Sequence, residues 1–227
     1  MTAATADSLP VSVVTALYFR TKALHLEAER TGIIRDLLRG KASREGYVLL
    51  LRNLLPAYRA MEHGLERHRG SPGLGEVARY RLDRAPAIES DLVAICGKAW
   101  ERDVPLLPAG EVYARRIAKA AEGDGARLIA HAYTRYLGDL SGGQILQRLL
   151  LRSLQLQPSE LSFYDFPGFS DVAALKADYR NALDQAGALL TDPQIVVEEG
   201  AIAFSLNIDL SCAVQTCMLP VAAAAAE

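Results

Sequence analysis

The sequence predicts an all-α, single-domain helical bundle. Alternating apolar patterns typical of strands are nearly absent, and apolar residues instead recur at three- and four-residue spacing over long segments. Short clusters of glycine and proline separate these segments. With 227 residues, half of them hydrophobic, the chain is long enough to bury one substantial core. We therefore expect helices packed around a single core.

Eight helices are expected. They span about 11–31, 32–39, 43–69, 74–98, 107–123, 124–154, 171–189 and 193–218. Breaks fall at the Gly/Pro clusters in 71–73, 105–110 and 167–168, since these residues end helices. The Thr-Asp-Pro sequence at 191–193 has the pattern of a helix N-cap followed by proline. Residues 157–170 are expected to form an aromatic connector with one short helical turn.

The ends of the chain set the expected domain boundaries. We expect a disordered arm over 1–10, a helical domain over 11–219 and a disordered, alanine-rich tail over 220–227. The first ten residues lack the basic and apolar segments of a secretory signal. No uncharged apolar stretch reaches 18 residues, so no membrane anchor is expected.

Charge and cysteine content indicate the setting of the protein. A net charge of −2 gives no reason to expect nucleic acid as a partner. The three cysteines, Cys96, Cys212 and Cys217, follow no metal or redox spacing, which is typical of free thiols in a reducing compartment. We expect a cytoplasmic protein that is a monomer or a weak dimer.

The most informative segment is 133–144, which reads YTRYLGDLSGGQ. Its three glycines interrupt a pattern that otherwise predicts one continuous helix, at a combined cost of about 2–3 kcal/mol relative to alanine. Gly138 and Gly142 are four residues apart and share a helix face. A face without side chains makes room for another body, either a neighbouring helix or a flat ligand. Spacing alone leaves both possibilities open.

Asp139 lies directly beside these glycines. A buried carboxylate needs a partner or a water molecule, and Arg135, one turn earlier, is a candidate partner. The alternative is a solvated i,i+4 ion pair that contributes little stability.

The first helix carries a second stripe of interest, formed by Tyr18, Lys22, His25 and Glu29 at spacings of four, three and four. A metal-binding imidazole must be neutral, and an acceptor must orient its second nitrogen, which Glu29 can provide. The alternative is an ordinary exposed histidine among charged neighbours.

Two further pairs lie late in the chain. Lys176 and Arg180 are four residues apart and can bind carboxylates, although such a pair is usually a solvated helix face. Phe204 and Asn207 share a face near the C-terminus, where the ordinary role of Phe204 is core packing.

The remaining histidines and motifs carry no clear chemistry. His63 and His68 lie among charged residues, which predicts an exposed surface, and His131 has no supporting pattern. No phosphate-binding loop or dinucleotide fingerprint is present, so no bound flavin or NAD is expected. No Cys-x-x-Cys-His motif is present either, so any haem would be held without covalent attachment.

Together these residues resemble the heme oxygenase family. The segment 133–146, YTRYLGDLSGGQIL, closely matches the distal-helix signature of that family. The segment 22–29, KALHLEAE, is similar to its proximal-histidine segment, and Tyr58 falls where the family has a distal-pocket tyrosine. The segments KADYR at 176–180 and FSLN at 204–207 match its propionate-binding and late-helix positions.

The resemblance covers about 14–69 and 126–210, and it is weak through 70–115. It implies haem b sandwiched between a proximal helix and a kinked distal helix. His25 would bind the haem iron, with Glu29 or water accepting its other N–H. The remaining haem-binding residues that the resemblance implies are Tyr18, Lys22, Tyr133, Thr134, Gly138, Gly142, Gly143, Lys176, Arg180, Phe204 and Asn207.

The resemblance also implies the chemistry. The reaction would be the cleavage of haem to biliverdin, CO and ferrous iron, with O2 as co-substrate and electrons from an external ferredoxin or reductase. Asp139 would anchor ordered water that relays protons. The implied catalytic residues are Tyr58, Arg135, Gly138, Asp139 and Gly142.

One departure and two alternatives accompany this interpretation. Tyr18 stands where many members of the family carry a basic residue, so the haem carbon that is attacked is not predicted. One alternative is a haem-binding carrier or sensor that does not degrade its ligand. The other is a di-iron oxidase, but no glutamate precedes any of the four histidines by three residues, as such sites require.

Overall fold

The computed structural model describes residues 12–219, and every regular element in that range is helical. The expected arm over 1–10 and the expected tail over 220–227 lie outside the described residues. In chain order the elements are α1 (Val13–Arg30), α2 (Gly32–Leu38), α3 (Arg44–Arg67), α4 (Leu74–Ala78), α5 (Ala85–Cys96), α6 (Trp100–Asp103), α7 (Pro108–Ala120), α8 (Leu128–Ala132), η1 (Tyr133–Leu137), α9 (Gly138–Ser153), η2 (Pro158–Glu160), η3 (Ser162–Tyr164), α10 (Val172–Ala188) and α11 (Gln194–Met218). The predicted all-α bundle is confirmed.

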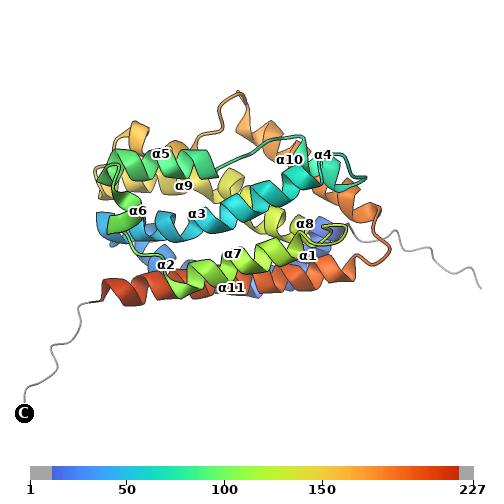
Figure 1. Cartoon of the computed structure of the whole chain (residues 1–227), viewed down its shortest axis with the longest axis horizontal. Helices are drawn as coiled ribbons and strands as arrows, with labels where there is room; N and C mark the ends of the chain where they lie inside the picture. Colours follow the sequence, from blue (N-terminus) through green and yellow to red (C-terminus); the bar gives the residue numbers. More distant parts are fainter. Residues whose placement is uncertain (1–11, 220–227) are drawn as a thin grey trace, which may run out of the picture.

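The bundle is organised around α3, which runs between α5 on one side and α7 on the other (Figure 1). Apolar side chains along most of α3 are buried, so little of this helix faces solvent. On the far side of α7, the long α11 packs against α1, α2, α7 and α8. Both α1 and the segment formed by η1 and α9 pack against α2, α10 and α11, so these three helices connect the two predicted halves of the site.

Within the described residues, α11 is long and apolar enough to cross a membrane, with a mean hydropathy of 1.3 over 18 residues. Core helices of globular proteins can have the same length and composition. Its polar side chains bond to other helices, since Ser211 accepts from the Ile34 N–H at 3.2 Å and Asn207 accepts from Arg135. We therefore describe α11 as part of the bundle.

Polar side chains lie at the starts of α1 and α11. The Ser12 hydroxyl accepts from the Thr15 N–H at 3.2 Å at the start of α1. The N-cap pattern expected at 191–193 is shifted, because α11 begins at Gln194 with Pro193 as its N-cap and has no side-chain cap. Asp192 accepts instead from the Gln194 N–H at 3.0 Å.

Two predicted helices are divided or shortened in the structure. The expected helix over 74–98 is wrong, because α4 ends at Ala78 and Arg81 adopts a left-handed φ of 48° before α5 begins. The expected helix over 124–154 begins instead at Leu128, since Gly123 and Gly125 have positive φ values of 64° and 70°. In addition, its residues 133–137 form a π-helical turn.

The connector before α10 contains two short 3₁₀ turns, η2 and η3, where one turn was expected. Two buried residues of the α5 region hold it in place. Asp91 accepts hydrogen bonds from the N–H groups of Ser162 at 2.8 Å and Phe163 at 2.9 Å. Arg84 donates to the carbonyl oxygen of Phe163 at 3.2 Å.

Candidate functional site

The glycines of α9 face different surroundings. A Cβ atom built on Gly138 or Gly142 meets no heavy atom within 4 Å, whereas one on Gly143 lies 3.2 Å from Cδ1 of Tyr164. A close helix–helix crossing at Gly138 and Gly142 would place neighbouring atoms there, so that alternative is wrong. These two glycines leave an open strip of helix backbone, and Gly143 packs against the connector.

A π-helical turn, η1, precedes this strip. Hydroxyl groups bond back to the helix on both sides of the junction, Thr134 to the carbonyl of Ala130 at 2.9 Å and Ser141 to the carbonyl of Leu137. Such bonds and π turns bend helices. Thr134, a predicted haem-binding residue, is buried and directs its hydroxyl into the helix.

Four predicted residues meet in one cluster, which we call the distal cluster: Tyr58, Arg135, Asp139 and Asn207. The Tyr58 hydroxyl donates to Oδ2 of Asp139 at 2.6 Å and accepts from Nε and Nη2 of Arg135 at 2.9 and 2.8 Å. Nη2 of Arg135 also lies 3.5 Å from Oδ1 of Asp139, and its Nη1 donates to Oδ1 of Asn207 at 2.7 Å. The Arg135 and Asp139 side chains are only 13% and 8% exposed, so the solvated-pair alternative is wrong.

Burial controls the ionisation of this cluster. It raises the pKa of Asp139, although Arg135 and the hydrogen bond from Tyr58 act in the opposite direction. Burial also raises the pKa of Tyr58 well above its usual value, so the phenol keeps its proton and remains a donor. A carboxyl group with a raised pKa beside a fixed donor is suited to accept and return protons.

The predicted iron ligand lies on α1. The His25 side chain is 58% exposed, and its Nδ1 lies 3.6 Å from Oε1 of Glu29, within ion-pair distance but longer than a hydrogen bond. Its ring packs against the buried Phe204 of α11, with 5.8 Å between centroids. The Phe204 side chain therefore has two roles, because it packs in the core and also contacts the ring of His25.

The predicted propionate-binding residues lie on α1, η1 and α10. Burial raises the pKa of Tyr133, whereas a hydrogen bond with Thr21 and the Arg180 cation lower it. Lys22 and Lys176 are exposed. Within residues 12–219, no ion pair involves Lys22, Lys176 or Arg180. Their charges are therefore available to an anionic ligand.

These surroundings fit a haem. No heavy atom lies within 4 Å of a Cβ built on Gly138 or Gly142, as a ring packed against this backbone would require. The imidazole of His25 can bind iron, and unpaired cations suit carboxylates. By contrast, the di-iron alternative finds no ligand set, since residues 12–219 contain no group of three His, Cys, Asp or Glu side chains able to hold a metal ion.

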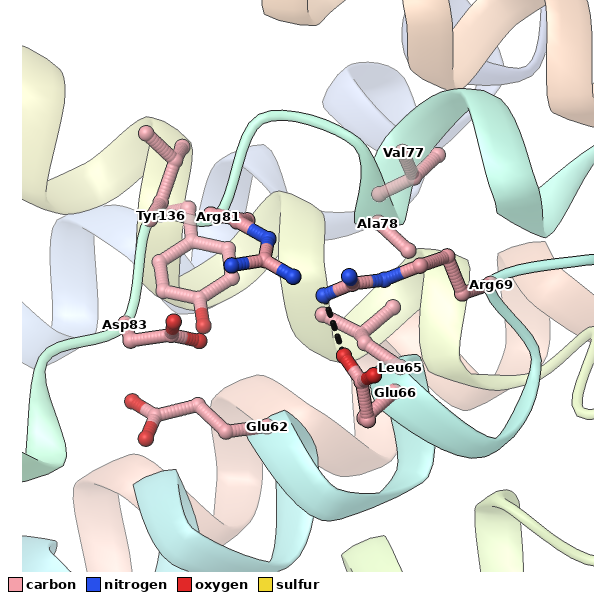
Figure 2. A pocket seen from close by; sticks show the side chains of 10 residues that line it. Glu62, Leu65, Glu66, Arg69, Val77, Ala78, Arg81, Asp83 and Tyr136 are labelled. Carbon is pink, nitrogen blue, oxygen red and sulfur yellow. Dashed lines mark ion pairs between the residues drawn. The ribbon is translucent and has the colours of Figure 1, made fainter.

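A small cavity of about 20 Å³ lies behind the π turn (Figure 2). The buried side chain of Tyr136 extends into it toward Asp83 and Glu62, while Glu66 pairs with Arg69 at its rim. This volume suits a single water molecule and not a macrocycle. It is separate from the open strip at Gly138 and Gly142.

The sequence did not reveal two groups of buried charged residues. Glu199 pairs with Arg116 and lies 2.9 Å from Nε2 of His131, so His131 does have a partner. Arg84 and Asp91 hold the connector through backbone groups, and such contacts leave no periodic trace in a sequence.

The predicted exposure of one histidine is wrong. The predicted exposure of His63 is confirmed, but His68 is only 9% exposed. Its Nε2 lies 2.9 Å from the carbonyl oxygen of Ala121, and its ring fills the space beside Gly125.

The chain is similar in sequence to known proteins. Residues 12–213 match the family model described as heme oxygenase. The chain is 36% identical to heme oxygenase 1 of Nostoc sp. over 191 residues, covering 84% of this chain and 80% of that protein. It is also 36% identical to heme oxygenase 1 of Homo sapiens over 207 residues, covering 90% and 72% of the two chains.

Solved structures share the fold of this chain. The crystal structure of heme oxygenase-1 from Synechocystis sp. in complex with heme has a TM-score of 0.83 and 31% identity, covering 91% of this chain and 94% of that chain. The structure of heme oxygenase from Leptospira interrogans has a TM-score of 0.83 and 33% identity, covering 89% and 100%. The chain belongs to the heme oxygenase family.

Proposed function

We propose that this protein is a heme oxygenase, which binds haem b and cleaves it to biliverdin, CO and ferrous iron. One observation carries the proposal. Phe204 and Asn207 are one turn apart on α11, and Phe204 contacts the ring of His25 while Asn207 accepts from Arg135 of the distal cluster. A predicted iron ligand and a buried proton-handling cluster therefore border the same turn of one helix.

His25 would hold the haem iron from α1, and the strip at Gly138 and Gly142 would face the other side of the ring. A neutral imidazole is the form that binds iron, and Glu29 is close enough to accept its other N–H after a small movement. Bound haem supplies the iron at which O2 reacts, and it is also the molecule that is cleaved.

The two haem propionates would lie where the free cations gather. Lys22, Lys176 and Arg180 supply positive charge, and Tyr133 supplies a hydroxyl group. Tyr18 adds a second hydroxyl without charge. These groups would fix the rotation of the ring in its plane.

The distal cluster would move protons. Asp139 would hold ordered water beside the open strip, and the Tyr58 hydroxyl and the Arg135 cation would fix the orientation of its carboxylate. No side chain occupies the strip itself, so a water molecule, rather than an acid–base side chain, would reach the reacting group.

We further propose that O2 is the co-substrate and that an external ferredoxin or flavoprotein reductase delivers the electrons. The sequence has no nucleotide-binding fingerprint that would let the chain hold NAD or a flavin itself. The proposed setting is the cytoplasm, with the chain present as a monomer or weak dimer.

Titration with hemin, followed by addition of a reductant and O2, tests the proposal. A heme oxygenase forms a one-to-one complex, loses its Soret band and releases biliverdin and CO. A non-degrading carrier would form the complex and keep its Soret band. Failure to form any complex would exclude both functions.

The His25→Ala variant tests the iron ligand. We expect loss of the histidine-ligated spectrum and of turnover, because His131 and His68 are buried and engaged by Glu199 and by the carbonyl of Ala121. His63→Ala, which changes an exposed histidine of α3, is the matched control and is expected to behave as the parent. A parent-like spectrum in His25→Ala would remove this residue from the site.

A further inference from the structure

Four tyrosines form a continuous series from the distal cluster toward the surface. Ring centroids are 6.3 Å apart between Tyr58 and Tyr136, 5.9 Å between Tyr136 and Tyr179, and 5.3 Å between Tyr179 and Tyr80. All three spacings lie within the range of direct aromatic contact. We call this series the tyrosine ladder. Its members come from α3, η1, α10 and the loop after α4.

The two ends of the ladder differ. Tyr58 is fully buried and donates its hydroxyl proton to Asp139 at 2.6 Å. Tyr80 is only partly buried and borders a surface groove, with the Arg79 guanidinium 5.1 Å from its ring centroid. The ladder therefore connects the proposed haem site to solvent.

Packing alone does not account for the hydroxyl groups. The Tyr179 hydroxyl is buried and has no hydrogen-bond partner among the described residues, which costs stability that phenylalanine would avoid. Phenylalanine would provide the same ring contacts to Tyr80 and Tyr136. What phenylalanine lacks is a phenol that can be oxidised by one electron.

We propose that the tyrosine ladder carries oxidising equivalents from the haem site to Tyr80, and so protects the protein when hydrogen peroxide reacts there. One H2O2 and two phenols give two water molecules and two tyrosyl radicals, with each phenol losing one electron and one proton. Asp139 accepts the proton of Tyr58 and solvent accepts that of Tyr80, and the same two sources return two protons to the peroxide as it becomes water. Tyr179 has no acceptor among the described residues, so it passes the charge on without losing its proton and the radical does not accumulate on it.

This inference rests on the proposed function, because bound haem is where the peroxide is reduced. The experiment treats the haem complex with H2O2 and a radical trap, and maps the adducts by peptide mass spectrometry. We expect the adduct on Tyr80, and its loss in Tyr80→Phe. Haem-free protein treated in the same way should carry none. An adduct on Tyr80 without haem would overturn the proposal, since free peroxide would then be the oxidant.

Interrupting the ladder gives the sharper test. Tyr136→Phe leaves Tyr80 in place, and we expect its labelling to fall to the level of the haem-free protein. Tyr164→Phe changes a buried tyrosine near the same site that is not part of the series, and should label as the parent does. Equal labelling of Tyr80 in Tyr136→Phe and in the parent would contradict the proposal.

Tyr179→Phe separates electron transfer from packing. Removing the unpaired hydroxyl should raise the unfolding midpoint, whereas labelling of Tyr80 should fall. A purely structural role would leave the labelling unchanged. Hemin binding and biliverdin formation are measured on the same samples. A complex that makes biliverdin without labelling Tyr80 would reject the ladder alone, and the absence of any complex would reject the proposed function.

Discussion

The glycines of α9 lie on an open face, proposed above to bind the ligand, and on a packed face. Gly142 faces open space, so Gly142→Ala should raise the free energy of unfolding of the haem-free protein by up to about 1 kcal/mol through helix propensity. Its hemin affinity should fall, because the new methyl group occupies the space proposed for the ring. Urea unfolding and hemin titration measure the two effects.

Gly143→Ala is the control, since its Cβ would lie 3.2 Å from Tyr164 and on the packed side of the helix. It should gain less stability and keep its hemin affinity. If Gly142→Ala also bound hemin as the parent does, the open strip would not be the ligand face.

The Tyr58 hydroxyl is expected to set the protonation of Asp139. Tyr58→Phe removes a hydrogen bond that lowers the pKa of Asp139, so that pKa should rise further and the acidic limb of the pH–rate profile should move to higher pH. A hydrogen bond to a charged group contributes about 1.5–3 kcal/mol, so the rate of biliverdin formation should fall about 10- to 100-fold. Tyr47→Phe, on the same helix, serves as control. An unshifted profile would separate Tyr58 from the proton relay.

The residues of the distal cluster could be predicted from helical spacing and from the resemblance to the family. Arg135 and Asp139 are four residues apart, and Tyr58 and Asn207 lie in segments that resemble the family. Their shared hydrogen bonds could not be predicted, since 81 residues separate Tyr58 from Asp139. Their roles in catalysis remain predictions.

At the scale of elements, periodicity predicted where helices lie but not every place where they break. The interruption after α4 depends on Arg81, whose left-handed backbone has no sequence signature, although Pro86 in the first turn of α5 does mark where the next helix starts. The π turn at 133–137 has the apolar pattern of an ordinary helix. The turn contacts α10 and α11, and such contacts between distant segments form only in the folded bundle.

The connector supports the distal helix from behind, and Asp91 holds it there. Phe163 packs edge-on against Tyr58 with 5.5 Å between centroids, and Tyr164 lies against Gly143. Asp91→Asn replaces one acceptor oxygen by an NH2 group that would face a backbone N–H. We expect a loss of about 1–3 kcal/mol in the free energy of unfolding and a lower kcat for biliverdin formation.

Glu89→Gln is the matched control on α5, because the Glu89 side chain is 41% exposed and, among the described residues, pairs with Arg59 alone. Such pairs contribute about 0–1 kcal/mol, so both stability and kcat should stay near the parent values. If Asp91→Asn lost stability but kept the parent kcat at saturating haem, the connector would not position the distal helix.

For the whole molecule, a buried ionic cluster joins α11 to α7 and α8. Burial raises the pKa of Glu199, but hydrogen bonds from His131 and Arg116 outweigh it and lower the pKa to about 2. Burial lowers the pKa of His131, and its Nδ1 has no partner among the described residues. Both observations indicate a neutral imidazole that donates through Nε2, since a charged ring would leave a buried N–H unpaired.

Acid should therefore weaken the bundle in two stages. Below pH 6.5 the unfolded chain binds a proton at His131 that the folded chain rejects, so stability begins to fall. From pH 4.5 down to about 2, Glu199 loses a stabilisation of about 3 kcal/mol, which is fully present only above its unfolded pKa of 4.5. Urea unfolding at a series of pH values measures both stages.

His131→Gln isolates the first stage, because glutamine can still donate to Glu199 but does not titrate. The variant is expected to lose less stability than the parent between pH 6.5 and 5, with the second stage unchanged. His63→Gln makes the same change at an exposed position and should follow the parent curve. Parallel curves for His131→Gln and the parent would mean that the imidazole is already charged in the folded protein, and that Glu199 is held by an ion pair with it.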